Sequence, residues 1–356
     1  MSNASAPTTD VRPCFSFDVG PLADYLAAAV AGFRGPLELR QFSGGQSNPT
    51  YLLTTPERRY VLRRKPPGVL LTSAHAVDRE YRVLAALGGA SDVPVPRVLA
   101  LCMDPAVIGT AFYVMDHIEG RVLRDAAFPE VGRDERPAYA EAVVDALARL
   151  HRVDYRAAGL ADFGREGGYL RRQFKRWSRQ YAEDAEAGRV PVMDRLIEWL
   201  PAQLPAAEET CIVHGDYRCD NVIFHPREPR VMAVLDWELA TLGNPLADFG
   251  YHLMMYRMPP LAVTGLLGRD LVALNLPDES RYVAWYCAKT GRDGIPGLDV
   301  LVAFNLFKLA AVCHGIRGRL LRGNAADAAA RNYAAQVEPI AELAWVQAER
   351  AMSATR

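Results

Sequence analysis

The sequence predicts an α+β fold of two lobes, a small strand-rich lobe followed by a larger helical one. From about Leu37 to Met115 the apolar residues recur in short, strand-like runs, whereas beyond Gly120 they recur at helical spacing. A chain of 356 residues is also too long for one compact core of ordinary size. The predicted domains are residues 1–36, an N-terminal segment with a leading helix, residues 37–118, the small lobe, and residues 119–356, the helical lobe.

The small lobe is predicted to contain three strands, a helix and two further strands. A helix is indicated where Val77, Tyr81 and Leu84 repeat every three to four residues, and the prolines of 93–96 end that pattern. The expected strands are 37–42, 50–54, 60–63, 98–102 and 111–115, and the expected helix is 76–87.

The second lobe is predicted to be mainly helical, with two short strand-like runs that carry polar residues at their ends. Its most apolar stretch, 300–316, is interrupted by Asn305, Lys308 and His314, so we expect a buried core helix and not a membrane span. The expected helices are 138–151, 169–187, 193–200, 279–290, 300–321 and 328–352, and the strand-like runs are 211–214 and 231–236.

Composition argues against several classes of partner. The formal net charge is −1, so nothing in the overall charge indicates nucleic acid or an anionic membrane. The six cysteines form no CxxC pair, which favours reduced, buried thiols in a cytoplasmic protein and argues against a zinc site. The first ten residues are small and polar, so we expect no signal peptide.

The segment with the most specific chemistry is His214-Gly215-Asp216, followed by Asn221 and, after a second strand-like run, by Asp236. Phosphoryl transfer needs a carboxylate that accepts the proton of the attacking hydroxyl, and oxygen ligands that hold Mg²⁺ on the phosphates. Asp216 suits the first role, and Asn221 and Asp236 suit the second. We expect His214 to orient the loop through a hydrogen bond. Glu238 is left open between a second metal contact and a solvent-facing strand end.

These motifs resemble the aminoglycoside phosphotransferase and choline kinase-like superfamily, whose fold is that of the protein kinases. The resemblance implies a bilobal fold with a small antiparallel sheet, ATP and Mg²⁺ as cofactors, and Asp216 as the catalytic residue. It also implies that Asp248, which follows Gly243-Asn244-Pro245, braces the catalytic loop.

In the small lobe, the resemblance places ATP against a glycine-rich loop and a strand–helix ion pair. Arg63 stands where the family carries a strand lysine, and Glu80 would be its partner, although a solvated helix carboxylate is the alternative. A turn of the same composition also occurs in plain hairpins, so the loop assignment depends on its position. Glycines there would let backbone N–H groups approach phosphate oxygens. The loop residues concerned are Gly44, Gly45, Ser47 and Asn48.

The segment 113–120 is expected to be the hinge that binds adenine. The family's geometry would have its backbone, around His117, bind the base while Val61 and Met115 sandwich the ring.

The acceptor is less well defined by the sequence. A basic run over 169–181 is either a solvated amphipathic helix or a cradle for an anionic acceptor; its basic residues are Arg171, Arg172, Lys175, Arg176 and Arg179. The closest resemblance is to the kinase-like region attached to some acyl-CoA dehydrogenases, which implies a hydroxy acid or hydroxyacyl-CoA as acceptor. The alternatives are an aminoglycoside kinase, a nucleotide-binding pseudokinase and a protein kinase. The sequence after Asp236 contains no long activation segment, which argues against a protein kinase.

Overall fold

The structure is a computed structural model that describes residues 7–43, 48–68, 76–261, 263–323 and 328–354. The chain forms two compact units, each described by itself. Unit 1 comprises Met1–Leu123, Asp154–Phe163 and Asp220–Ala240, and unit 2 comprises Arg124–Val153, Gly164–Cys219 and Thr241–Arg356. The predicted limit at residue 118 lies near the first of these boundaries, but two later segments also belong to unit 1.

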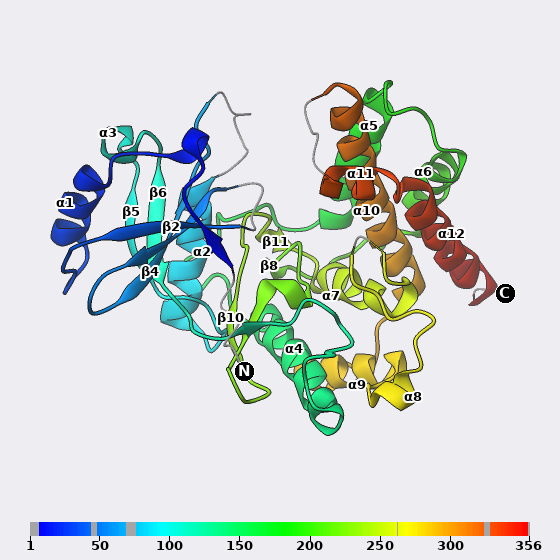
Figure 1. Cartoon of the computed structure of the whole chain (residues 1–356). Coiled ribbons are helices and arrows are strands. Elements are labelled where there is room, and N and C mark those ends of the chain that lie inside the picture. Colours follow the sequence, from blue (N-terminus) through cyan, green and yellow to red (C-terminus); the bar gives the residue numbers. More distant parts are fainter. Residues whose placement is uncertain (1–6, 44–47, 69–75, 262, 324–327, 355–356) are drawn as a thin grey trace. The chain divides into compact units, whose positions relative to one another are not determined.

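Unit 1 is built on a six-stranded antiparallel sheet in the order β1-β2-β3-β4-β6-β5 (Figure 1). The predicted order of three strands, a helix and two strands is confirmed. The bounds are β1 Thr8–Thr9, α1 Val19–Ala29, β2 Glu38–Phe42, β3 Thr50–Thr54, β4 Arg59–Arg64, α2 Val77–Ala90, β5 Val98–Cys102, α3 Pro105–Ile108 and β6 Phe112–Asp116, with a 3-10 turn at Pro13–Phe15.

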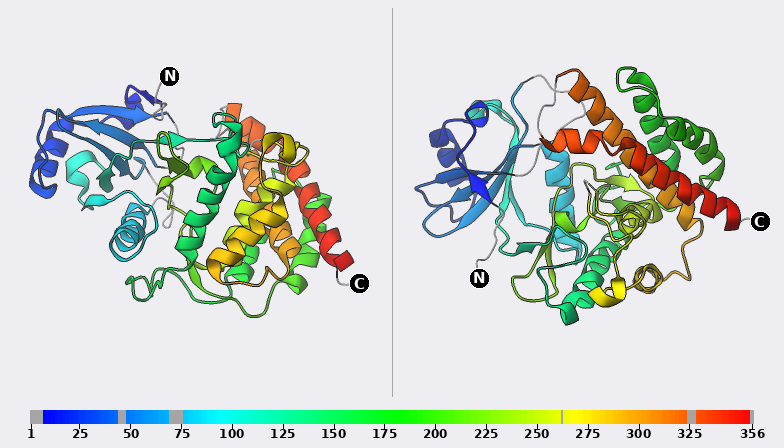
Figure 2. Two further views of the ribbon diagram at one scale, coloured as in Figure 1. Left: turned by 90° about the horizontal axis from the view of Figure 1, so that it is seen from below. Right: turned by 45° about the vertical axis from the view of Figure 1, so that its right-hand side comes forward.

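The two faces of this sheet are covered by different helices, α1 and α2 (Figures 1 and 2). Because side chains alternate along a strand, Tyr60 and Leu62 of β4 point into a core with Leu22 and Leu26 of α1. The alternate residues, among them Arg63, point to the face that α2 covers. The core face is mainly apolar, although the buried Arg64 lies on it beside Phe17; the face that carries Arg63 is called the charged face.

Two segments from later in the chain complete unit 1. A small antiparallel sheet joins β7 (Arg121–Val122), β9 (Val222–Phe224) and β10 (Val231–Val234) in the order β10-β9-β7. The segment Asp154–Phe163 contacts α2, where Arg79 donates to the carbonyl of Phe163 at 2.7 Å and Arg82 pairs with Asp162. Helix α2 is thus fixed by residues that lie about eighty positions further along the chain.

Unit 2 is mainly helical and contains a two-stranded sheet of β8 (Cys211–Val213) and β11 (Thr241–Gly243). The predicted single helix 328–352 is two helices, α11 and α12. Pro339 lies in the first turn of α12, where a backbone N–H has no helical partner, so its missing N–H costs nothing. In one continuous helix, its ring would clash with the carbonyl of residue 335, four positions earlier, which explains why two helices form. The helices are α4 Arg136–His151, α5 Tyr169–Glu183, α6 Pro191–Gln203, α7 Pro245–Leu253, α8 Leu271–Leu274, α9 Glu279–Thr290, α10 Leu298–Leu321, α11 Ala328–Ala334 and α12 Val337–Ala354, with 3-10 turns at Arg133–Glu135, Cys219–Asn221 and Met254–Arg257.

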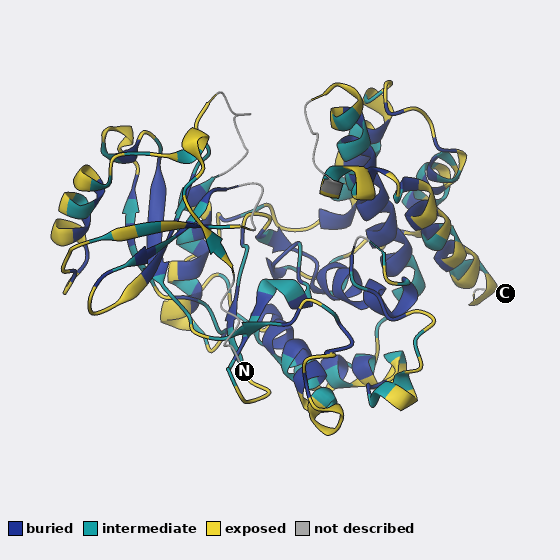
Figure 3. Ribbon diagram, viewed as in Figure 1, coloured by how far each residue is buried: buried dark blue, intermediate teal, exposed yellow. Residues whose placement is uncertain are grey.

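Helix α10 forms the centre of unit 2 and is covered by α12, α7 and α5 (Figure 3). By length and composition it could cross a membrane, but 78% of its most apolar window is buried in the fold, as in the core helix of a globular protein. Five cysteines are buried as predicted, whereas the expectation for Cys14 is wrong: it lies exposed in the 3-10 turn Pro13–Phe15, which buries none of its residues.

Candidate functional site

The charged face of the sheet in unit 1 holds a buried ion-pair cluster around Arg63. Its Nε lies 2.8 Å from Oε2 of Glu80, whose side chain is 2% exposed. Glu80 also accepts hydrogen bonds from Asn48 Nδ2 at 2.8 Å and from the Tyr113 hydroxyl at 3.0 Å. Of the two interpretations of Glu80, the ion-pair partner is therefore correct, and the solvated helix carboxylate is wrong.

The pKa values within this cluster reflect burial opposed by charge. Burial raises the pKa of Glu80, and the neighbouring Arg63 lowers it without cancelling that effect. Burial alone would lower the pKa of Arg63, but the carboxylates of Glu80 and Asp236 outweigh it and raise the pKa above its ordinary value. Arg63 is thus a permanent cation on this face.

The predicted metal ligands Asn221 and Asp236 meet at one end of the β9–β10 hairpin. Val222 pairs with Val234, and the residues just outside this pair are joined by a hydrogen bond from Leu235 N to Asn221 O at 2.8 Å. Asp236 then leaves the strand with a φ of 66°, a left-handed conformation that non-glycine residues rarely adopt.

Arg63 bridges from Glu80 to this hairpin end. Its Nη2 donates to Asp236 Oδ1 at 2.7 Å and lies 3.3 Å from Glu238 Oε2. Glu238 is 26% exposed at its side chain and points toward the cluster, so it is more than a solvent-facing strand end.

The oxygen donors of this end suit Mg²⁺ better than a transition metal. Asn221 offers an amide oxygen and Asp236 and Glu238 offer carboxylates, which are hard ligands. Within the described residues, no three His, Cys, Asp or Glu side chains form a closed metal cage. That arrangement fits magnesium, which is usually held by one or two carboxylates together with substrate phosphates and water.

In unit 2, the loop 214–216 follows β8 and is fixed by the carboxylate of Asp248. Asp248 Oδ2 accepts from His214 N at 2.7 Å and Oδ1 accepts from Gly215 N at 2.9 Å. His151 Nε2 lies 3.2 Å from Oδ2. Burial alone would raise the pKa of Asp248, but its hydrogen bond with His151 and the nearby His214 hold it below its ordinary value. The brace expected of Asp248 is present.

Helix α7, which carries Asp248, is placed by its own N-cap and by a close backbone approach. The side chain of Asn244 accepts from Leu246 N at 2.8 Å and Ala247 N at 3.1 Å, and Pro245 occupies the first helical position. A Cβ on Gly243 would lie 2.8 Å from Tyr169 and Val213 side-chain atoms, so only glycine fits there.

The carboxylate of Asp216 contacts Tyr251 and Arg218 in unit 2. The Tyr251 hydroxyl, one turn after Asp248 on α7, donates to Asp216 Oδ1 at 2.5 Å. Arg218 Nε lies 3.3 Å from the same oxygen. His214 is fully buried and its Nδ1 accepts from Asp216 N at 3.3 Å, which supports an orienting role for this histidine.

The hinge residues differ in one respect from the expectation. Val61 and Met115 are direct partners in the β4–β6 pairing. Directly opposed residues of antiparallel strands point to the same face, so these two side chains form one wall and cannot sandwich a ring between them. His117 follows β6. Burial lowers its pKa, and the charge of Arg59 lowers it further.

Part of the predicted glycine-rich loop, Gly44, Gly45 and Ser47, lies outside the described residues. Asn48, the last residue of that loop, is described and is fully buried. Its side chain donates to Glu80 and so supports the ion pair.

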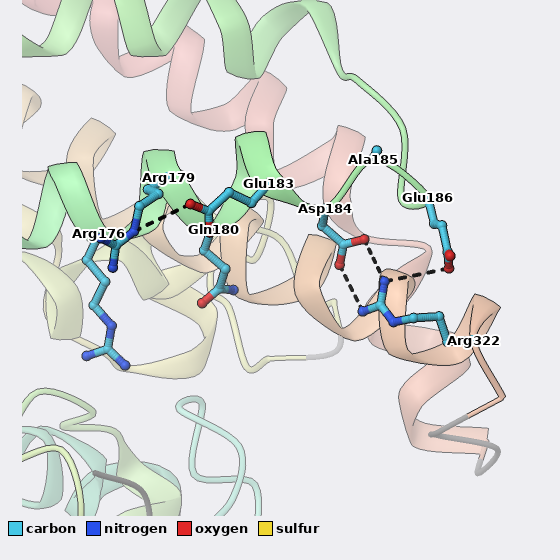
Figure 4. A pocket seen from close by; sticks show the side chains of 8 residues that line it. All are labelled: Arg176, Arg179, Gln180, Glu183, Asp184, Ala185, Glu186 and Arg322. Atoms are coloured by element: carbon cyan, nitrogen blue, oxygen red, sulfur yellow. Dashed lines mark hydrogen bonds and ion pairs between the residues drawn. The ribbon is translucent and has the colours of Figure 1, made fainter. Parts of the chain in front are cut away.

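The basic helix α5 is amphipathic, with Tyr169, Phe174 and Trp177 buried. Its outer end lines a cavity of about 540 Å³ (Figure 4). The cavity residues are Arg176, Arg179, Gln180, Glu183, Asp184, Ala185, Glu186 and Arg322. Three arginines here face three carboxylates, so this cavity is not a cationic cradle.

Arg176 differs from its neighbours in that cavity. Arg322 bonds to Asp184 at 2.7 and 3.1 Å and Arg179 lies 3.9 Å from Glu183. The Arg176 side chain points away from the Asp184–Arg322 pair in Figure 4, and within the described residues it pairs with no carboxylate.

Two residues of this site, Tyr251 and Lys308, escaped sequence reasoning. Tyr251 lies three positions after Asp248, a spacing that puts both on one side of a helix. Lys308 interrupts an apolar helix, and a lysine in such a place must be paired in the fold. Its Nζ donates to the carbonyl of Gly215 at 2.8 Å. The sequence contained both signals but not the identity of the partners.

Comparison with known proteins shows the family of the chain. The sequence profile described as the phosphotransferase enzyme family matches residues 38–282. Acyl-CoA dehydrogenase family member 11 of Gallus gallus is 44% identical over 346 residues, which are 94% of this chain and 44% of that protein. The chain therefore spans less than half the length of this relative.

Solved structures show the same fold. The crystal structure of a candidate aminoglycoside phosphotransferase from Ralstonia eutropha has a TM-score of 0.86 at 45% identity, covering 94% of this chain and 99% of that one. A thermostable mutant of aminoglycoside phosphotransferase APH(4)-Ia, in a ternary complex with AMP-PNP and hygromycin B, has a TM-score of 0.61 at 15% identity, covering 92% of this chain and 98% of that one. The second likeness concerns the fold alone.

Proposed function

Because the chain belongs to the phosphotransferase enzyme family, we propose that it transfers the terminal phosphoryl group of Mg-ATP to a hydroxyl of a small molecule. The observation that carries this proposal is the Arg63–Glu80 pair extended to Asp236. An arginine replaces the lysine implied by the resemblance, yet it makes the strand–helix ion pair and reaches the predicted metal ligand.

In the proposed reaction, the acceptor oxygen forms a bond to the γ-phosphorus while the bond from that phosphorus to the β–γ bridging oxygen breaks and ADP leaves. Asp216 accepts the proton of the hydroxyl as the new bond forms. The Tyr251 hydroxyl donates to Oδ1 of Asp216 and so orients the carboxylate that receives this proton.

Asn221 and Asp236 would hold Mg²⁺, which neutralises charge on the transferring phosphoryl group when bound. Arg63 would add a fixed positive charge beside them and keep Asp236 in place. The chain's contribution is thus positioning and electrostatics, without a covalent intermediate.

For the acceptor, we propose an anionic hydroxy compound, namely a hydroxy acid or a hydroxyacyl-CoA. Arg176 supports this class, because its exposed guanidinium is not neutralised by a carboxylate of the described chain. Burial lowers the pKa of Lys308, next to the catalytic loop, and the charge of Arg176 lowers it further. The chain's similarity to an acyl-CoA dehydrogenase family member gives independent support.

The test is ADP release from Mg-ATP in the presence of hydroxy acids, hydroxyacyl-CoAs, aminoglycosides, choline and sugars, with wild type beside Asp216→Ala. Acceptor-dependent release with anionic compounds, reduced about 100- to 10,000-fold in the variant, is the expected result. Turnover with aminoglycosides but with no anionic compound would refute the acceptor class. Near-normal turnover in Asp216→Ala would refute the role of Asp216, and nucleotide binding without turnover would favour a pseudokinase.

A further inference from the structure

A single lysine stands in the apolar middle of α10. Lys308 is 7% exposed, and the residues on either side of it, Phe307 and Leu309, are buried as well. Removing an ammonium group from water costs several kcal/mol unless it is paired. A residue with only a packing role at this place would be apolar, so the contacts of Lys308 indicate what its charge does.

Those contacts all lead to the catalytic loop. Lys308 Nζ donates to the carbonyl oxygen of Gly215 at 2.8 Å and lies 4.6 Å from the ring centroid of Tyr251. The Gly215 carbonyl belongs to the peptide that enters Asp216, and the Tyr251 hydroxyl holds the carboxylate of Asp216. Lys308 thus contacts both the backbone and the side-chain support of one residue.

The loop needs such a support because Gly215 has a φ of 84°, a conformation that is freely accessible to glycine and that glycine also leaves easily. Asp248 fixes the peptide N–H on one side of Gly215 at 2.9 Å. Lys308 fixes the carbonyl on the other side. With both peptide groups held, the direction in which the Asp216 side chain leaves the backbone is set.

We propose that Lys308 is a positioning residue for phosphoryl transfer, which orients Asp216 through the Gly215 carbonyl and the Tyr251 ring. This inference rests on the function proposed above.

The charges of the surroundings agree with this role. Burial lowers the pKa of Lys308, while the carboxylates of Asp216 and Asp248 act in the opposite direction.

The experiment compares Lys308→Met with His314→Leu in the full chain. Methionine keeps the length of the lysine stem without its charge. His314 is a matched control because it is buried on the same helix and its Nε2 lies 2.7 Å from another glycine carbonyl, that of Gly188, which is not part of the catalytic loop.

Three quantities are measured for each variant: the melting temperature, kcat and KM for ATP with the best acceptor, and amide hydrogen exchange over 211–219. We expect Lys308→Met to lower kcat about 10- to 100-fold with KM for ATP nearly unchanged, and to speed exchange over 211–219. His314→Leu should lower the melting temperature similarly but change neither kcat nor that exchange.

Equal kcat in the two variants, or equal exchange over 211–219, would overturn the proposal. If wild type shows no acceptor-dependent turnover, the proposed function fails, and the exchange comparison still decides whether Lys308 holds the loop. If Lys308→Met does not fold, Lys308→Gln takes its place under the same criteria.

Discussion

Replacing Arg63 by methionine tests the ion-pair cluster of unit 1 most directly. The side chains of Arg63 and Glu80 are 11% and 2% exposed, so water screens their attraction very little. Methionine would leave the Glu80 carboxylate buried without its cation. Removing one partner of a buried pair costs about 3–5 kcal/mol. We expect about 3 kcal/mol, because Asn48 and Tyr113 still donate to Glu80.

The matched control is the double variant Arg63→Met with Glu80→Gln, which removes both charges. Its free energy of unfolding, measured by urea denaturation at pH 7, should recover at least half of the loss seen in the single variant. If the loss of stability in Arg63→Met comes from the unpaired charge of Glu80, the double variant should lose less free energy of unfolding than the two single variants do together. A double variant as unstable as the sum of the two single variants would refute this reasoning, as would a single variant within about 0.5 kcal/mol of wild type.

The pH dependence gives a second check on the same variant. Burial already raises the pKa of Glu80 in the folded protein, and loss of Arg63 would raise it further. An acid whose folded-state pKa is raised binds its proton more tightly when folded. The single variant should therefore regain stability relative to wild type as the pH falls through the folded-state pKa of Glu80, down to the unfolded value of about 4.3. A deficit that does not change with pH would contradict the assignment to Glu80.

Three further changes test other parts of the site. Asp236→Ala should lower kcat/KM by about 100-fold or more and abolish the dependence of nucleotide binding on Mg²⁺, which a magnesium titration would show. Asp248→Asn should destabilise unit 2 at neutral pH; because the pKa of Asp248 is depressed in the folded state, the difference from wild type in denaturant unfolding should shrink as the pH falls below about 4. Gly243→Ala should lower the free energy of unfolding by about 1–3 kcal/mol, because the added Cβ would clash with Tyr169. Gly291→Ala is the control: no atom lies within 4 Å of its Cβ position, but its φ is 69°. Thermal melts of the two variants would therefore separate the effect of crowding from that of backbone strain.

Local patterns in the sequence were enough to predict five strands and helix α2 of the small lobe, but not the short helix α3. The reason is that strand alternation and helical spacing are set by neighbours in the chain. The family motif also identified Glu80 as the partner of Arg63. The relation between Val61 and Met115 could not be obtained in this way, because it depends on the register between β4 and β6.

Partners far apart in the chain were the main omissions. Lys308 binds Gly215 across 93 positions, and Arg79 binds Phe163 across 84. No local pattern specifies such pairs, because many carbonyls compete for one donor until the fold selects among them. For the same reason, the sequence could not predict that Asp154–Phe163 and Asp220–Ala240 belong to unit 1.

The discontinuous make-up of unit 1 has a consequence for how the protein can be synthesised and dissected. A fragment ending at Leu123 would contain Arg63 and Glu80 but neither Asp236 nor the segment that fixes α2. On the ribosome, the cluster cannot close until Asp236 and Glu238 have emerged, more than 150 residues after Glu80. Contacts of such high sequence separation slow folding, and a fragment of unit 1 cut at the end of the sheet should be unstable.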